Sequence, residues 1–199
     1  MSIKTSIKDH FTNSQFKEHF KSSGLKNHWN YFFQGDIDNE VSKQLYFDSE
    51  LDFRGFSPED LDECTLLYRK VFTQYPWYDE WKSFYQARKY LKELIDNPVF
   101  KGLVVRQDSK MVAVCLGHQR TWWMGKEFVV DEFFVENGRQ GNGIGTRTLD
   151  LLTTNLLKDG YNRLILLTNK EIPAEMFYLK NGFYNNEKRT VMVKELGKI

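Results

Sequence analysis

The sequence predicts a mixed α/β (α+β) domain in which a mostly antiparallel central sheet is flanked by helices. Two observations predict it. Strand-like runs joined by a short turn come first, over residues 100–121, and a strand–helix–strand unit follows, over residues 128–168. A hairpin gives an antiparallel pair, whereas a strand–helix–strand crossover gives a parallel one. We therefore expect residues 51–199 to form one domain, preceded by an extension at residues 1–50.

Length and composition suit one soluble globular domain. The chain has 199 residues, of which 41% are hydrophobic and 28% charged. Its 28 Lys and Arg residues nearly balance 27 Asp and Glu residues, which leaves a net charge of +1. Such a charge gives no general attraction to nucleic acid or to an anionic membrane. No apolar run has the length of a membrane span or the form of a signal peptide, so the expected location is cytoplasmic.

The first fifty residues are strongly aromatic. Nine aromatic side chains fall before residue 51, too many for a flexible polar tail. We expect this helical extension to pack on the main domain or on another subunit, and a homodimer is one expectation that follows.

From Leu51 onward the pattern becomes regular. Residues 51–56 alternate like a strand, and Ser57 with Pro58 forms an N-cap and first turn for a helix that runs to about Thr73. A second helix is expected over residues 79–96, with Trp81 on its apolar face.

Strands, turns and two helices are expected over the rest of the chain. Gln107–Lys110 is expected to turn a hairpin, and Gly125 to turn the chain into the strand before a glycine-rich loop. The expected strands are 100–106, 111–121, 128–135, 163–168 and 189–194, and the expected helices are 144–158 and 174–180.

Neither the cysteines nor the histidines suggest a metal site or a disulfide. Cys64 lies on an apolar helical stripe and Cys115 in an apolar strand, where cysteine is most often a small buried hydrophobe. The four histidines are scattered without ligand spacing, so we expect no bound metal.

The most informative segment is the glycine-rich stretch from Gln140 to Thr146. Glycines at alternate positions between a strand and a helix expose backbone amides that form a site for an anion. A nucleoside-triphosphate loop needs Lys directly after its last glycine, but Gly145 is followed by Thr146 and Arg147. A dinucleotide fingerprint fails too, because its third glycine would fall on Thr146 or Thr148. A phosphate-bearing cofactor of another kind is therefore expected.

Two motifs in this element order resemble the GNAT superfamily of acetyl-coenzyme A-dependent N-acetyltransferases. The family motif (Arg or Gln)-x-x-Gly-x-(Gly or Ala) is matched by Gln140, Gly143 and Gly145. A second signature, Tyr-x-Lys-x-Gly-Phe, is matched by residues 178–183. The resemblance covers residues 51–195 and implies a GNAT-like fold, with acetyl-coenzyme A as co-substrate.

The resemblance also implies where the coenzyme binds. The loop amides would hold its pyrophosphate, with side-chain donors from Gln140 and Asn142, and the pantetheine arm would pair with strand backbone before the loop. The side chains of Phe133 and Phe134 are expected in the core. The Asn that the family often carries before its last motif falls here on Glu171, which leaves Asn169 as the candidate. The expected coenzyme residues are Phe133, Phe134, Val135, Gln140, Gly141, Asn142, Gly143, Ile144, Gly145, Thr146 and Asn169.

Three residues are the catalytic candidates. By resemblance, Tyr178 is the general acid that protonates the leaving thiolate, since a tyrosine hydroxyl is protonated at neutral pH. Asp131 and Glu132 are candidates for capture and deprotonation of the amine. Adjacent strand residues normally point to opposite faces, although a bulge could change which one faces the site. The strand resembles that of spermidine/spermine N-acetyltransferases, where Asp131 takes the place of the catalytic acid.

The predicted reaction is acetyl transfer to a primary amine of a small molecule, such as a polyamine or an amino sugar, in a ternary complex. Trp77 and Trp122 are substrate-binding candidates, since with their aromatic neighbours they could form a cage for a cation. Both could equally belong to the core. The alternatives are a non-catalytic acyl-coenzyme A-binding regulatory module and an acetyltransferase that acts on a protein amine.

Overall fold

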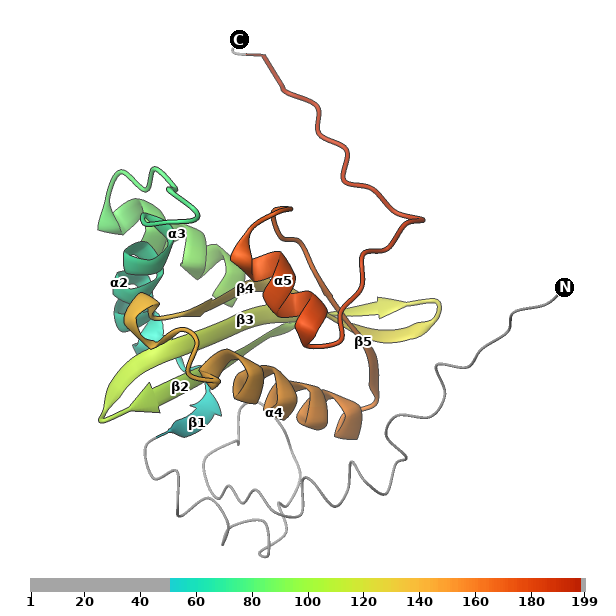
Figure 1. Cartoon of the computed structure of the whole chain (residues 1–199), viewed down its shortest axis with the longest axis horizontal. Helices are drawn as coiled ribbons and strands as arrows, with labels where there is room; N and C mark the ends of the chain where they lie inside the picture. The colour runs from blue at the N-terminus through green and yellow to red at the C-terminus, as the bar shows by residue number, and fades with distance from the viewer. Residues whose placement is uncertain (1–50, 198–199) are drawn as a thin grey trace, which may run out of the picture. The chain divides into compact units, whose positions relative to one another are not determined.

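The computed structural model describes residues 51–197 (Figure 1). The chain divides into two compact units. The first unit ends at Leu166 and the second begins at Leu167. The expected aromatic extension, residues 1–50, lies outside the described residues.

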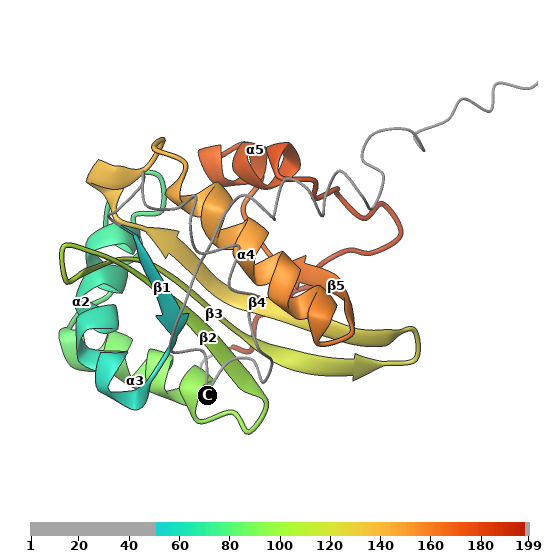
Figure 2. The same cartoon turned by 90° about the horizontal axis from the view of Figure 1, so that it is seen from below.

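A five-stranded sheet forms the centre of the first unit. Its spatial order follows the chain order, and the first four strands pair antiparallel, whereas the last two pair parallel (Figure 2). This is the predicted mixed, mostly antiparallel sheet. The strands are β1 (Asp52–Gly55), β2 (Phe100–Gln107), β3 (Lys110–Trp122), β4 (Gly125–Val135) and β5 (Tyr161–Leu166).

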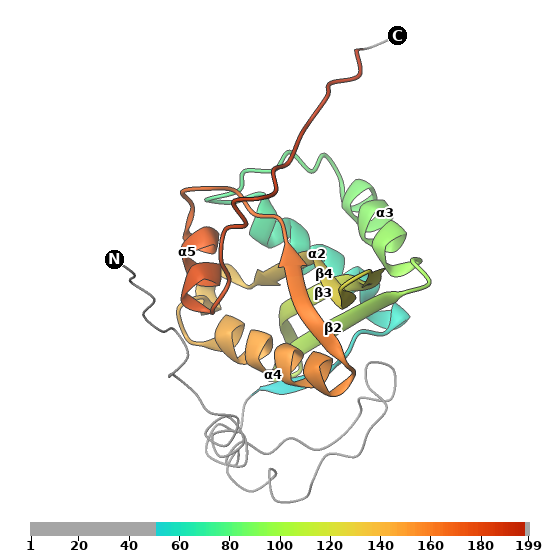
Figure 3. The ribbon, with the colours of Figure 1, turned by 90° about the vertical axis from the view of Figure 1, so that its right-hand side faces the viewer.

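Helices cover both faces of this sheet. Figure 3 shows α2 and α3 on one face and α4 on the other. The helices are α2 (Leu61–Phe72), α3 (Phe84–Ile95) and α4 (Ile144–Lys158), and short 3₁₀ turns occupy Pro58–Asp60 and Asn137–Arg139. We call the side that carries α2 and α3 the α2/α3 face.

Local sequence signals predicted the positions of several elements correctly. Asp108 and Ser109 have φ angles of 50° and 64°, as required of the two central residues of a tight hairpin turn. The bounds of α4 are those predicted, because Gly143 ends the loop in the left-handed region and serves as the N-cap. The start of α3 was predicted five residues too early. The helix begins only after Ser83, whose side chain accepts a hydrogen bond of 3.1 Å from the Gln86 amide.

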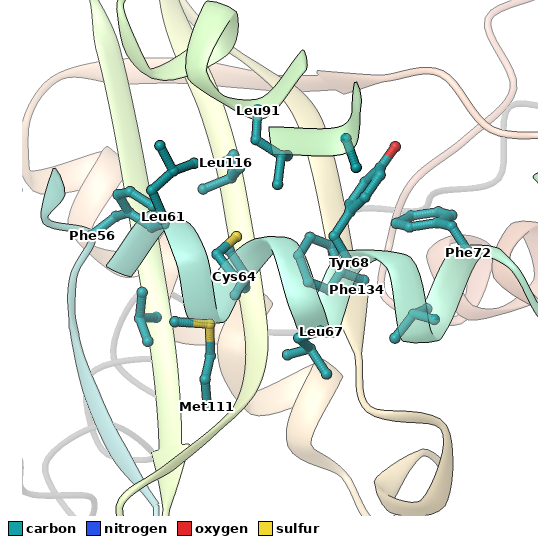
Figure 4. Packing of buried hydrophobic residues seen from close by; sticks show 14 residues of the cluster. Phe56, Leu61, Cys64, Leu67, Tyr68, Phe72, Leu91, Met111, Leu116 and Phe134 are labelled. Atoms are coloured by element: carbon teal, nitrogen blue, oxygen red, sulfur yellow. The ribbon is translucent and has the colours of Figure 1, made fainter. Parts of the chain in front are cut away.

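A hydrophobic core fills the space between the sheet and the helices α2 and α3 (Figure 4). Trp81 precedes α3 rather than lying on it, yet its ring packs against this core, as expected of an apolar side chain. Cys64 belongs to the core and Cys115 is also fully buried, as predicted. The residues labelled in Figure 4 are Phe56, Leu61, Cys64, Leu67, Tyr68, Phe72, Leu91, Met111, Leu116 and Phe134.

The second unit contains one helix, α5 (Pro173–Lys180), within residues 167–197. The strand predicted over residues 189–194 is wrong, since this segment has no regular secondary structure. Val191, Met192 and Val193 are 63%, 88% and 79% exposed. The alternating apolar pattern that suggested a strand needs a partner backbone to become one, and this segment pairs with none of the described strands.

Candidate active site

The glycine loop has the backbone geometry that its sequence predicted. Gly141 and Gly143 have φ angles of 80° and 78°, in the region that favours glycine, and a side-chain carbon at either position would meet no atom within 4 Å. The amides of Ile144, Gly145 and Thr146 begin α4, so they have no acceptor within the helix. They stand at its positive end, where an anion is stabilised.

The polar side chains of the loop form hydrogen bonds to nearby backbone carbonyl groups. Gln140 donates from Nε2 to the carbonyl oxygen of Val135 at 2.9 Å, and Asn142 donates from Nδ2 to the carbonyl oxygen of Arg139 at 3.4 Å. Both side chains were expected to bind phosphate. Gln140 thereby links the loop to the end of β4, and the role of both side chains as phosphate donors stays a prediction.

The last residues of β4 extend beyond the end of its parallel neighbour. The final pair between β4 and β5 joins Val130 to Leu166, so residues 131–135 continue without β5 beside them. The amide of Glu136 donates to Val112 of β3 at 2.8 Å. Since backbone groups alternate in direction along a strand, those of Phe133 and Val135 point away from β3, toward the side that β5 has left. Phe134 is 3% exposed and lies in the core, as predicted, whereas Phe133 is only partly buried, so its expected core position is wrong.

A β-bulge places the two candidate acids on one face. Leu116 of β3 pairs with Glu132, and the next residue, Gly117, pairs with Val130, so Asp131 is the extra residue. Glu132 contacts Tyr68 and Tyr90 of the covering helices. Asp131 contacts His118, which alternation along β3 assigns to the face of Leu116. Both acids therefore lie on the α2/α3 face.

Gly117 permits the bulge. An added side-chain carbon there would stand 2.3 Å from the carbonyl oxygen of Val129 and 2.6 Å from the ring of Phe128. Only a residue without such a carbon allows β4 to approach β3 this closely, which explains the glycine opposite the bulge.

Glu132 is held by two phenols in largely apolar surroundings. Its Oε1 accepts hydrogen bonds from Tyr90 Oη at 2.6 Å and from Tyr68 Oη at 3.2 Å. Burial raises the pKa of Glu132 to about 7, an effect that the two hydrogen bonds partly oppose and that the charges of Asp79 and Asp131 add to. This carboxyl group therefore changes its charge near neutral pH.

Asp131 has a different partner. Its Oδ2 lies 2.8 Å from Nδ1 of His118, and the two side chains are 20% and 27% exposed. His118, Tyr68 and Tyr90 were not predicted as site residues. Tyr68 and Tyr90 are 64 and 42 residues from Glu132 in the chain, so only the fold reveals the contacts.

The structure does not bring Trp77 and Trp122 together. The ring of Trp77 lies 5.2 Å from that of Phe72, whose ring is 5.7 Å from that of Phe134. Phe134 pairs with Val114, and Trp122 lies eight residues further along β3. At roughly 3.3 Å per residue, that separation is about 26 Å. Trp122 lies near the hairpin tip, with Arg120 5.3 Å above its ring. A single cage built from both tryptophans is therefore wrong.

Tyr178 and Asn169 belong to the second unit. Tyr178 lies on α5, half-buried, with the rings of Phe177 and Phe183 each 5.3 Å away. Asn169 is exposed in the segment before that helix. The roles of general acid and of coenzyme contact stay predictions for these two residues.

Residues 51–197 contain neither a candidate metal site nor a candidate membrane-spanning helix. No group of three or more His, Cys, Asp or Glu side chains in this range could hold a metal ion. None of the helices in the same range has the length and apolar character needed to cross a membrane.

The fold and the glycine loop define an acetyltransferase-type architecture, which solved structures share. An aminoglycoside acetyltransferase from an uncultured soil metagenomic sample is 16% identical, with a TM-score of 0.59 over 76% of this chain and 99% of its own. A ribosomal-protein-alanine N-acetyltransferase from Brucella melitensis biovar Abortus 2308 is 18% identical, with a TM-score of 0.56 over 74% and 99%. The structure of AAC(6')-Iy with a bisubstrate analogue of coenzyme A is 12% identical, with a TM-score of 0.59 over 75% and 100%.

The sequence profile of the acetyltransferase (GNAT) family matches residues 61–183. The chain belongs to this family. A comparison with curated proteins found no match.

Proposed function

We propose that this protein transfers an acetyl group from acetyl-coenzyme A to a primary amine of a small molecule. One observation carries the proposal. A glycine loop at the N-terminus of α4 follows a strand whose bulge presents Asp131 and Glu132 side by side on one face. The loop suits an anionic donor, and the two carboxyl groups suit a cationic acceptor.

The donor would bind along β4 and the loop. Amides from Gly141 to Thr146 would hold the pyrophosphate of coenzyme A, and the pantetheine arm would pair with the backbone of Phe133 and Val135. The similar structure of AAC(6')-Iy, which was solved with coenzyme A, supports this choice of donor.

The acceptor amine would bind at the two acids. Most aliphatic amines are ammonium ions at neutral pH, so an ionised Glu132 would attract the acceptor, and removal of a proton must precede attack on the thioester. Tyr178 would give its proton to the departing thiolate. The amine would attack directly within a ternary complex. An acyl-enzyme through cysteine is disfavoured, because burial raises the pKa of both Cys64 and Cys115.

The substrate class follows from the acidic site and the similar structures. A small cationic amine, such as a polyamine or an amino sugar, suits two carboxyl groups on one face. The soil aminoglycoside acetyltransferase was solved with sisomicin, which supports an amino-sugar acceptor.

An amine panel tests the proposal. The full chain is incubated with acetyl-coenzyme A and with polyamines, amino sugars, aminoglycosides or amino-terminal peptides, and released thiol is measured with a chromogenic reagent. Both cysteines are fully buried, so folded protein adds little background. The expected result is thiol release that depends on a small amine, with an acetylated product of matching mass. Turnover with peptides alone would instead identify a protein acetyltransferase. Coenzyme binding without turnover on any amine would indicate a regulatory module.

A further inference from the structure

The pair formed by His118 and Asp131 is the second polar cluster at the bulge. Nδ1 of His118 lies 2.8 Å from Oδ2 of Asp131. The other ring nitrogen, Nε2, has no hydrogen-bond partner among residues 51–197. The side chain of His118 is 27% exposed, so part of it is accessible from solvent.

The fold fixes this pair in place. His118 follows Gly117, the residue that lets β4 approach β3 at the bulge. Asp131 is the extra residue of that bulge, so its side chain turns to the same face as Glu132. Changing the register of β3 and β4 by one residue would separate the imidazole from the carboxylate.

We propose that His118 is the residue that accepts the proton of the acceptor amine, with Asp131 as its positioning partner. The inference rests on the proposed function and names a catalytic residue for it. Asp131 accepts the hydrogen bond from Nδ1–H, which orients the ring and leaves Nε2 as the unprotonated nitrogen.

The reaction removes two protons from the nitrogen of the acceptor. Nε2 takes one proton from the ammonium ion, R–NH₃⁺, and leaves the neutral amine. The amine nitrogen attacks the thioester carbonyl carbon, a C–N bond forms, and the C–S bond breaks. The general acid gives its proton to the departing thiolate, and the second proton of that nitrogen passes through solvent to restore the general acid. His118 then returns its proton to solvent, and the products are the amide and free thiol.

Glu132 is less suited to this step. Its Oε1 already accepts from Tyr68 of α2 and Tyr90 of α3, and the charge of Asp79 also acts on it. The carboxyl group of Glu132 would instead attract the ammonium ion. The two residues thus have separable effects: His118 on turnover and Glu132 on amine affinity.

The test compares H118Q with the wild-type protein on the best amine of the panel and on a fluorinated, less basic analogue of it. Gln lacks the basic ring nitrogen and keeps an amide N–H that can donate to Asp131. We expect kcat for the basic amine to fall about 100-fold while KM and coenzyme affinity change little. The analogue is already neutral at the assay pH, so kcat for it should fall much less.

Two further variants complete the design. Y161F removes a hydrogen bond of 2.8 Å to Gln119, the next residue of β3, and should retain wild-type kcat. Should H118Q fail to fold, as judged by thermal unfolding, D131N keeps an acceptor for Nδ1–H and should lower kcat in the same amine-dependent way.

An equal loss of kcat with both amines would give His118 a purely structural role, and no loss would remove it from the reaction. Either result overturns the role proposed for His118 but not the proposed acetyltransferase function. Absence of turnover by the wild-type protein on every amine would overturn the proposed function itself.

Discussion

The hydroxyl group of Tyr90 donates a hydrogen bond of 2.6 Å to Oε1 of Glu132 and so ties α3 to the bulge of β4. Tyr68 donates to the same oxygen at 3.2 Å. Hydrogen bonds to a carboxylate favour its ionised form, whereas burial opposes it. The charge of Glu132 near neutral pH is therefore set by the balance between its burial and these two phenols.

The first prediction concerns this balance. In Y90F one hydrogen bond to the carboxylate is lost, so the pKa of Glu132 should rise above about 7, by roughly one unit for a bond of about 1–1.5 kcal/mol. The KM of the amine, measured against pH, should improve only at a correspondingly higher pH than in the wild-type protein. Y68F, which removes the longer bond, should give a smaller displacement. Coincident pH profiles for wild type and Y90F would contradict the assignment of Glu132 as the amine-binding carboxylate.

The second prediction concerns stability. Burial raises the pKa of Glu132 from 4.5 to about 7, so the native state binds more protons than the unfolded state between these values. The free energy of unfolding must then fall as pH rises through this window, by about 3 kcal/mol, and level off above it. E132Q keeps an acceptor for both phenols and carries no charge. Urea unfolding from pH 4.5 to 8 should show that the free energy of unfolding of E132Q increases relative to that of the wild type as pH rises. A constant difference across that range would show that Glu132 is not destabilised by ionisation.

The third prediction concerns the glycine opposite the bulge. In G117A the new methyl group would clash with the backbone of Val129, so β3 and β4 must separate locally. We expect a loss of about 1–3 kcal/mol in the free energy of unfolding, typical of overpacking, together with reduced turnover. Chemical denaturation measures the first effect. Stability within about 0.5 kcal/mol of the wild type would mean that the close approach at Gly117 is not required.

The fourth prediction concerns the proposed general acid. Y178F removes the hydroxyl group and keeps a ring that can pack against Phe177 and Phe183. Turnover should fall by about 100-fold or more, with coenzyme affinity nearly unchanged. Steady-state kinetics and calorimetry with coenzyme A measure the two quantities. Wild-type turnover in Y178F would remove this residue from the mechanism.

Much of the fold could be predicted from the sequence, because its signals are local. The bounds of α4 follow from Gly143, and the β2–β3 turn follows from Gln107–Lys110 between two strand-like runs. The start of α3 was misplaced because Trp81 continues the apolar stripe although the helix begins only after the Ser83 cap. The strand at residues 189–194 failed because its formation depends on a partner that lies outside the local pattern.

The site could be predicted only in part, for a related reason. The sequence identified Asp131, Glu132 and the glycine loop, which lie within sixteen residues of one another. A bulge depends on how two strands pair, so the sequence left open which acid faces the site. The phenols that hold Glu132 and the imidazole that holds Asp131 come from α2, α3 and β3, and their contacts exist only in the folded chain.

Every proposed role depends on binding of coenzyme A at the glycine loop, and thermal unfolding of the full chain with coenzyme A measures that binding. Binding to the native state at about 100 times the dissociation constant should stabilise the protein by about 2.7 kcal/mol. G143A should lose most of this shift, because its φ of 78° strains any other residue at the N-cap of α4. G138A, in the same segment with open space around it, is the matched control and should keep the shift. An unchanged melting temperature of the wild-type protein at saturating coenzyme A would show that the loop does not bind coenzyme A.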